Sequence, residues 1–145
     1  MNSDGTGLSK LTGTTNDTHP MWKPDGTQIT FGRTLTSKGI WVMNADGSNQ
    51  QGLTTDPADE QHADWSPDGS KITYRSDKAG NYDVWVMDSD GANPKQITTF
   101  PSNDRNPDWS ADSTRIMFRS DNLMLRLKQI RLTSTLYCTS YFTRK

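Results

Sequence analysis

Apolar and polar residues alternate along short stretches of this chain, and small or charged residues separate these stretches. In the clearest example Ile72 and Tyr74 alternate with polar neighbours, and Val84 and Val86 repeat the spacing twelve residues later. A period of two predicts β-strands with one buried face. No helical period of 3.6 residues occurs before residue 122. We therefore expect four strands, at positions named A to D, in each stretch of about 44 residues.

The same pattern returns at a fixed spacing. Trp22, Trp65 and Trp109 lie 43 and 44 residues apart, and Trp41 and Trp85 lie 44 apart. A repeat of four short strands every 40–50 residues is typical of propeller blades. The predicted fold class is all-β: a β-propeller of four-stranded antiparallel blades, with three blades' worth of strands in the chain.

Asp-Gly pairs mark the expected hairpin turns, where glycine accommodates a positive φ that strains other residues. These structural turn residues are Asp25, Gly26, Asp46, Gly47, Asp68, Gly69, Asp90 and Gly91. The third copy has Ser113 in the glycine position, so we expect a strained turn there. The turns lack the spaced ligands and closing Glu of a calcium-binding EF-hand loop, which favours a structural role.

The phase of the repeat suggests how the chain is divided. Residues 1–12 correspond to the end of a blade with a strand D, 13–56 and 57–100 to two blades, and 101–121 to a partial blade. Three blades are too few for a ring, since propellers have four to eight. We therefore expect a homodimer that closes six blades, with each amino-terminal strand D completing the last blade of the partner.

Residues 122–145 depart from the repeat. They contain no Gly, Pro, Asp or Glu, and their basic residues are Arg126, Lys128, Arg131, Arg144 and Lys145. Three interpretations stay open for this basic, apolar tail: a replacement strand C, non-native sequence, or a functional basic segment.

The segment Trp65–Ile72, followed by Val84–Gly91 and Gln96–Thr98, resembles the TolB-like β-propeller repeat, and partial copies stand at Trp22–Gly26 and Ile40–Gly47. The resemblance covers residues 1 to about 121. Such blades occur in periplasmic TolB and in the propellers of prolyl-oligopeptidase-like enzymes, so the resemblance implies a fold without one function. It also suggests a periplasmic or extracytoplasmic location, although this sequence shows no export signal.

Strand A is expected to be innermost, where its polar residues would line the central channel. The positions one and three residues before each repeated tryptophan share a strand face. These channel-lining candidates are His19, Met21, His62, Asp64, Asn106 and Asp108. Imidazole and carboxylate groups suit a transition metal, which makes His19, His62, Asp64 and Asp108 weak metal candidates; the alternative is a simple polar lining.

Composition and the absence of known motifs reduce the number of functional classes to consider. The formal net charge is −1 and the chain has a single cysteine, Cys138, so neither nucleic-acid binding nor a disulfide framework is indicated. No apolar run is long enough for a membrane span, and no Gly-x-Ser-x-Gly, His-Glu-x-x-His or phosphate-loop motif is present. We expect a non-catalytic propeller scaffold that binds a protein partner and needs no cofactor. The alternatives are a propeller fragment with no activity beyond assembly and a propeller domain detached from a hydrolase.

Overall fold

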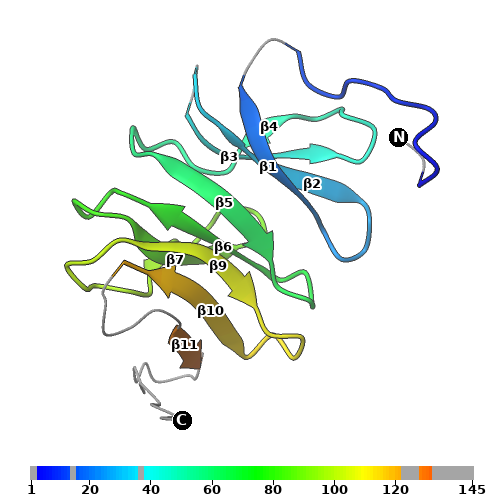
Figure 1. Cartoon of the computed structure of the whole chain (residues 1–145). Coiled ribbons are helices and arrows are strands. Elements are labelled where there is room, and N and C mark those ends of the chain that lie inside the picture. The colour runs from blue at the N-terminus through cyan, green and yellow to red at the C-terminus, as the bar shows by residue number, and fades with distance from the viewer. Residues whose placement is uncertain (1–2, 14–15, 36–37, 122–127, 132–145) are drawn as a thin grey trace.

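The protein has an all-β fold, and its described residues form three antiparallel sheets (Figure 1). The computed structural model describes residues 3–13, 16–35, 38–121 and 128–131. Within these ranges no helix is long and apolar enough to cross a membrane.

Each sheet is one blade of consecutive strands. The first blade contains β1 (Asp17–Trp22), β2 (Gln28–Arg33), β3 (Gly39–Asn44) and β4 (Gln51–Gly52). The middle blade contains β5 (Glu60–Trp65), β6 (Lys71–Ser76), β7 (Asp83–Asp88) and β8 (Lys95–Gln96). The third blade contains β9 (Asp104–Trp109), β10 (Arg115–Ser120) and β11 (Lys128–Arg131).

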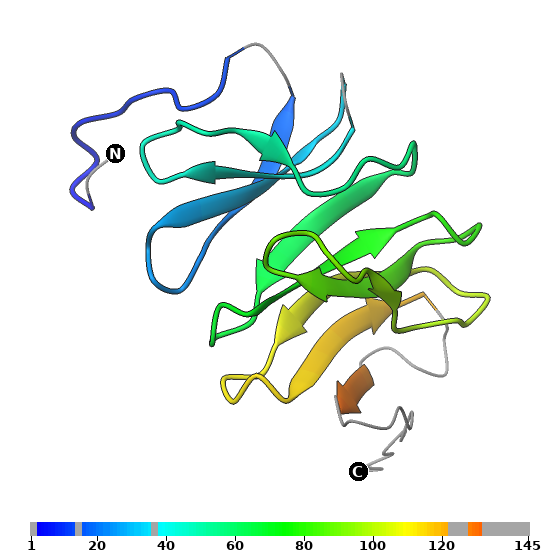
Figure 2. The same cartoon turned by 180° about the vertical axis from the view of Figure 1, so that it is seen from behind.

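The three blades follow one another side by side, with the middle blade between the other two in both views (Figures 1 and 2). Strand β5 contacts all of β1, β2 and β3, and β9 contacts β5, β6 and β7. The predicted all-β fold with four-stranded antiparallel propeller blades is confirmed. The third sheet has three described strands, and β11 lies in the tail, where strand C of that blade was one of the expectations.

Apolar side chains fill the spaces between blades. On the middle blade, Trp65, Ile72 and Tyr74 form what we call the front face, and Val84 and Val86 belong to the back face. The front face packs on Ile40 and Val42, from the back face of the first blade. The back face packs on Trp109, Ile116 and Phe118, from the front face of the third blade. Because burying such side chains stabilises by about 1.5–3 kcal/mol each, adjacent blades depend on each other for their stability.

A β-bulge interrupts the inner strand of each blade. Gln61 pairs with Arg75 and Asp64 with Thr73, so His62 and its neighbour together oppose one residue of β6. The bulged residue takes a left-handed conformation in all three blades. The φ values are 51° at His19, 55° at His62 and 52° at Asn106. The bulge changes which side chains of strand A point to each face of the sheet. As a result, the tryptophan at the end of strand A points into the interface between blades.

The described amino-terminal segment, residues 3–13, differs from the expectation. Residues 3–13 contain no strand, although a strand D was expected at about 7–12. The physical reason is that a strand requires a hydrogen-bonded neighbour, and the described residues place no strand C beside this segment.

Candidate functional site

The channel-lining candidates of the inner strands β5 and β9 are more exposed than the buried residues that alternate with them. In β5, Ala63 and Trp65 are buried, whereas His62 and Asp64 are partly exposed. In β9 the same alternation leaves the polar positions Asn106 and Asp108 exposed. In β1, His19 and Met21 are exposed. Their role as a channel lining stays a proposal.

His19 and His62 form a pair across the boundary between the first and middle blades. Their ring centroids are 3.7 Å apart, with the ring planes inclined at 39°. Burial, together with the positive charges of His19 and Arg75, lowers the pKa of His62 to about 4. His62 is therefore neutral near pH 7, and its Nδ1 atom is buried without a hydrogen-bond partner among the described groups.

Asp64 and Asp108 form a second pair, across the boundary between the middle and third blades. Burial, with a further contribution from the Asp108 carboxylate, raises the pKa of Asp64 to about 6. The Oδ2 atom of Asp64 accepts a hydrogen bond from the backbone N–H of Trp109 at 3.2 Å, and its carbonyl oxygen accepts one from Trp109 Nε1 at 3.3 Å. Asp64 thus joins two blades through both its backbone and its side chain.

Four of the six predicted residues are brought together as two pairs, His19 with His62 and Asp64 with Asp108. In the described part of the chain, no three His, Cys, Asp or Glu side chains lie close enough to hold a metal ion. Two imidazoles alone are fewer than the three or four protein ligands of a typical zinc site. A metal role for these residues therefore has no further support from the geometry.

The sequence reasoning missed a set of buried carboxylates. Asp83 and Asp104 are 1% and 0% exposed. Burial raises the pKa of Asp83, which accepts hydrogen bonds from Thr98 Oγ1 and Gln96 Nε2, both at 3.0 Å. Glu60, also buried, takes the equivalent place of Asp104 one blade earlier. The repeat of acidic residues could have revealed these positions, because Asp17, Glu60 and Asp104 recur at the same spacing as the tryptophans.

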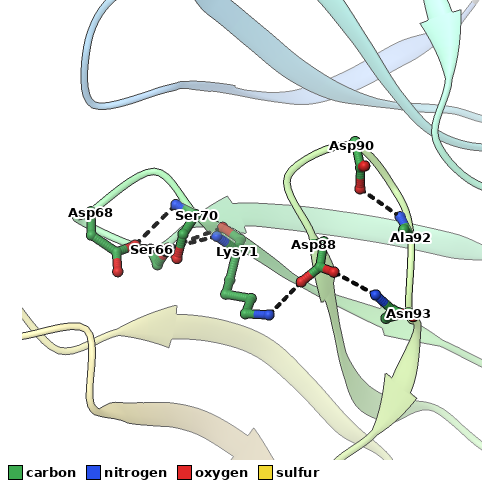
Figure 3. A network of polar contacts seen from close by, with 8 residues as sticks. All are labelled: Ser66, Asp68, Ser70, Lys71, Asp88, Asp90, Ala92 and Asn93. Carbon is green, nitrogen blue, oxygen red and sulfur yellow. Dashed lines mark hydrogen bonds and ion pairs between the residues drawn. The ribbon is translucent and has the colours of Figure 1, made fainter.

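The Asp-Gly turns form local hydrogen-bond networks (Figure 3). Asp68 Oδ1 accepts hydrogen bonds from Ser70 N at 3.0 Å and from Ser66 Oγ at 2.6 Å, and Asp90 Oδ1 accepts one from Ala92 N at 2.9 Å. These bonds lower the pKa of Asp68. The four turn glycines Gly26, Gly47, Gly69 and Gly91 all have positive φ, and Ser113 has φ of 57°, which confirms the strained third turn.

Each end of the three-blade unit exposes an apolar side chain, although Ile29, Phe31 and Met43 on the first blade are buried. Trp22, on the first blade, is 54% exposed, whereas its equivalents Trp65 and Trp109 are 4% and 9% exposed. At the other end, Met117 is 47% exposed on the back of β10, whereas the equivalent Thr73 is fully buried. Each exposed residue lies where a neighbouring blade covers its equivalent inside the chain.

Solved structures share this architecture. A structure described as putative TolB from Agrobacterium tumefaciens matches with a TM-score of 0.77 and 23% identity, over 84% of this chain and 48% of that one. The tricorn protease matches with a TM-score of 0.63 and 16% identity, over 82% and 14%. The nidogen/laminin complex contains a chain that matches with a TM-score of 0.62 and 13% identity, over 78% and 47%. The chain therefore spans half or less of the length of each of these proteins.

No curated protein sequence matches the chain. The sequence model described as the Tricorn protease N-terminal beta propeller domain matches residues 35–136, which is more than half of the chain. The structural matches to TolB support the expected TolB-like type of repeat. The chain belongs to the family of Tricorn protease N-terminal beta-propeller domains.

Proposed function

We propose that this protein is a non-catalytic β-propeller module that binds other protein chains, and that the first of these is a second copy of itself. The observation that carries the proposal is the exposure of Trp22 on an end face whose equivalents are buried between blades. A neighbouring blade covers the equivalent residues Trp65 and Trp109, and a further blade would cover Trp22 in the same way. Two copies provide six blades, within the usual range for a closed ring.

A closed ring would present the loops at the blade ends, and the inner residues described above, to a further partner. A chain of similar fold occurs in the nidogen/laminin complex. The sequence motifs of nucleic-acid binding and of catalysis are absent, so protein recognition suits this surface best.

The molar mass of the purified chain in solution tests the proposal. Light scattering on a sizing column should give twice the chain mass of 16.3 kDa, with a β-type circular dichroism spectrum. Trp22→Asp should shift the mass to that of one chain, because a carboxylate at the centre of an apolar interface is costly. Leu35→Asp is the matched control, since Leu35 is also more than half exposed but lies in the β2–β3 connection. A native chain that is folded and monomeric would overturn the proposal and would favour a fragment without separate activity.

A second candidate is a propeller domain that serves a larger hydrolase. The family match and the tricorn protease structure support it. The coding sequence on both sides of this chain is the test: a Gly-x-Ser-x-Gly nucleophile elbow would favour this function, and an unrelated domain or none would remove its basis.

A further inference from the structure

The amino-terminal segment already lies where a strand D would end. Leu11 packs against Ile29, Phe31 and Met43 on the front face of the first blade. Leu53, just after β4, packs in the same way on the middle blade, and Ile97, just after β8, on the third. The backbone of Leu11 also lies against the first blade as the backbone of Leu53 lies against the middle blade. A Cβ added at Gly47 would be 3.0 Å from Leu11 O, and one added at the equivalent Gly91 would be 2.7 Å from Leu53 O. Leu11 therefore occupies the position that follows strand D of a preceding blade.

In the two complete blades this position is tied to strand C. Leu53 N donates to Ile40 O and Ile97 N donates to Val84 O, each at 2.8 Å. Just before these residues, β4 and β8 pair with β3 and β7. No described strand pairs with residues 9–10, the equivalent of β4 and β8 before Leu11.

The third blade has a strand C but no described strand D. Its sheet order is β11-β10-β9, so the outer edge of β11 has no neighbour among the described strands. An open edge is a template for another strand. The described residues thus contain one strand C without a strand D beside it, and one segment in the place of strand D without a strand C beside it.

We infer that residues 7–12 of one copy add to the free edge of β11 in a second copy and complete its third blade as a fourth strand. The inference rests on the proposed self-assembly and adds its mechanism, a reciprocal exchange of strands. The back face of the third blade then meets the front face of the partner's first blade, which repeats the interface already formed twice within the chain and covers both Trp22 and Met117. Because the contact is made twice in a two-fold ring, the assembly closes and does not grow into a fibre.

The repeat also specifies the register. β8 pairs with β7 as Trp85 with Gln96 and Val86 with Lys95. The pairing of β10 with β11 places Lys128 and Gln129 at the positions of Trp85 and Val86. Ser9 of one copy should therefore lie opposite Gln129 of the other.

Disulfide cross-linking tests this register. Two differently tagged chains, one with Ser9→Cys and one with Gln129→Cys, are coexpressed with Cys138→Ser in both, so that a disulfide between the two tags joins different molecules. Directly opposed strand residues have the Cβ separation that a disulfide needs, so mild oxidation should shift the protein on non-reducing gels from the mass of one chain to that of two. In the control, Lys10→Cys replaces Ser9→Cys, which moves the thiol to the other strand face and should leave the single-chain band.

The outcomes separate the two proposals. Strong cross-linking for Ser9→Cys and little for Lys10→Cys supports strand exchange. A dimer in light scattering with equal or no cross-linking for the two pairs overturns strand exchange and leaves self-assembly intact. A chain that carries both Ser9→Cys and Gln129→Cys and forms an internal disulfide as a monomer overturns both.

Discussion

Two substitutions in the inner strand should change the pH dependence of stability in opposite directions. The folded-state pKa of Asp64 is about 6, against an ordinary value of 3.8. Between these values the folded protein binds more protons than the unfolded chain, so this carboxyl group lowers the stability as the pH rises from about 4 to 6. The pKa of His62 is lowered to about 4 from 6.5. Here the unfolded chain binds more protons, so the ring lowers the stability as the pH falls from 6.5 to 4.

The magnitude follows from the size of these shifts. A shift of about two pKa units corresponds to about 3 kcal/mol. Because both side chains remain partly exposed, solvent screening reduces this figure, and we expect about 1 kcal/mol from each group. Asp64→Asn removes the titrating carboxyl and keeps an oxygen for the Trp109 N–H. His62→Asn removes the imidazole. Asparagine suits this position because Asn106, the equivalent residue of the third blade, has the same left-handed backbone conformation.

The assay is urea unfolding, followed by circular dichroism at fixed protein concentration and ionic strength, from pH 4 to pH 8. Relative to the native chain, Asp64→Asn should gain unfolding free energy as the pH rises from 4 to 6. His62→Asn should have its largest relative gain near pH 4 and lose it above pH 6.5. The exposed turn residue Asp112 is the control, because hydrogen bonds from Ser110 and Thr114 lower its pKa; Asp112→Asn should lose stability at pH values above about 4. Differences of the same size at every pH for Asp64→Asn and His62→Asn would refute the reasoning.

Three further changes test the packing and the turns by denaturant unfolding. Gly91→Ala should cost at least about 2 kcal/mol, because it combines a positive φ with a Cβ that would lie 2.7 Å from a backbone oxygen; Gly26→Ala, with a positive φ but nothing within 4 Å, should cost about 1 kcal/mol, and equal costs would contradict the close contact. Ser113→Gly should stabilise the protein by up to about 1 kcal/mol, because it relieves the left-handed turn at φ of 57°; a loss of stability would show that the Ser113 hydroxyl outweighs the strain. Trp65→Ala should cost about 3–5 kcal/mol, because the side chain is 4% exposed between two blades, and a cost below about 1 kcal/mol would contradict the assigned core.

Much of the fold could be predicted from local pattern. The alternation around Ile72 and Tyr74 reflects the period-two geometry of a strand, and the Asp-Gly pairs reflect the backbone conformation of tight turns. The repeat of tryptophans at intervals of 43 and 44 residues was sufficient to predict propeller blades. The bulge was not predictable, because the residue at its centre is His in two copies and Asn in the third, and the sequence does not show which residue is left unpaired.

The candidate site depended on contacts between blades, which local pattern does not contain. Sequence alone placed His62 and Asp64 on one strand face, but only the packing of adjacent blades set His62 against His19 and Asp64 against Asp108. Burial in those contacts then moved the pKa values in opposite directions.

The sequence by itself determined the alternating stretches, the hairpin turns and the repeat of the blade, because these patterns depend on neighbours within a few residues. The segment 7–12 shows that a strand also needs a hydrogen-bonded partner, which the local pattern does not supply. The tertiary structure decided which equivalent residues are covered and which are open. Trp22, Trp65 and Trp109 occupy the same place in three copies of one pattern, yet only Trp22 is exposed. The physical reason is that a blade buries its apolar faces only against another blade, so the fate of each face depends on whether a neighbour is present.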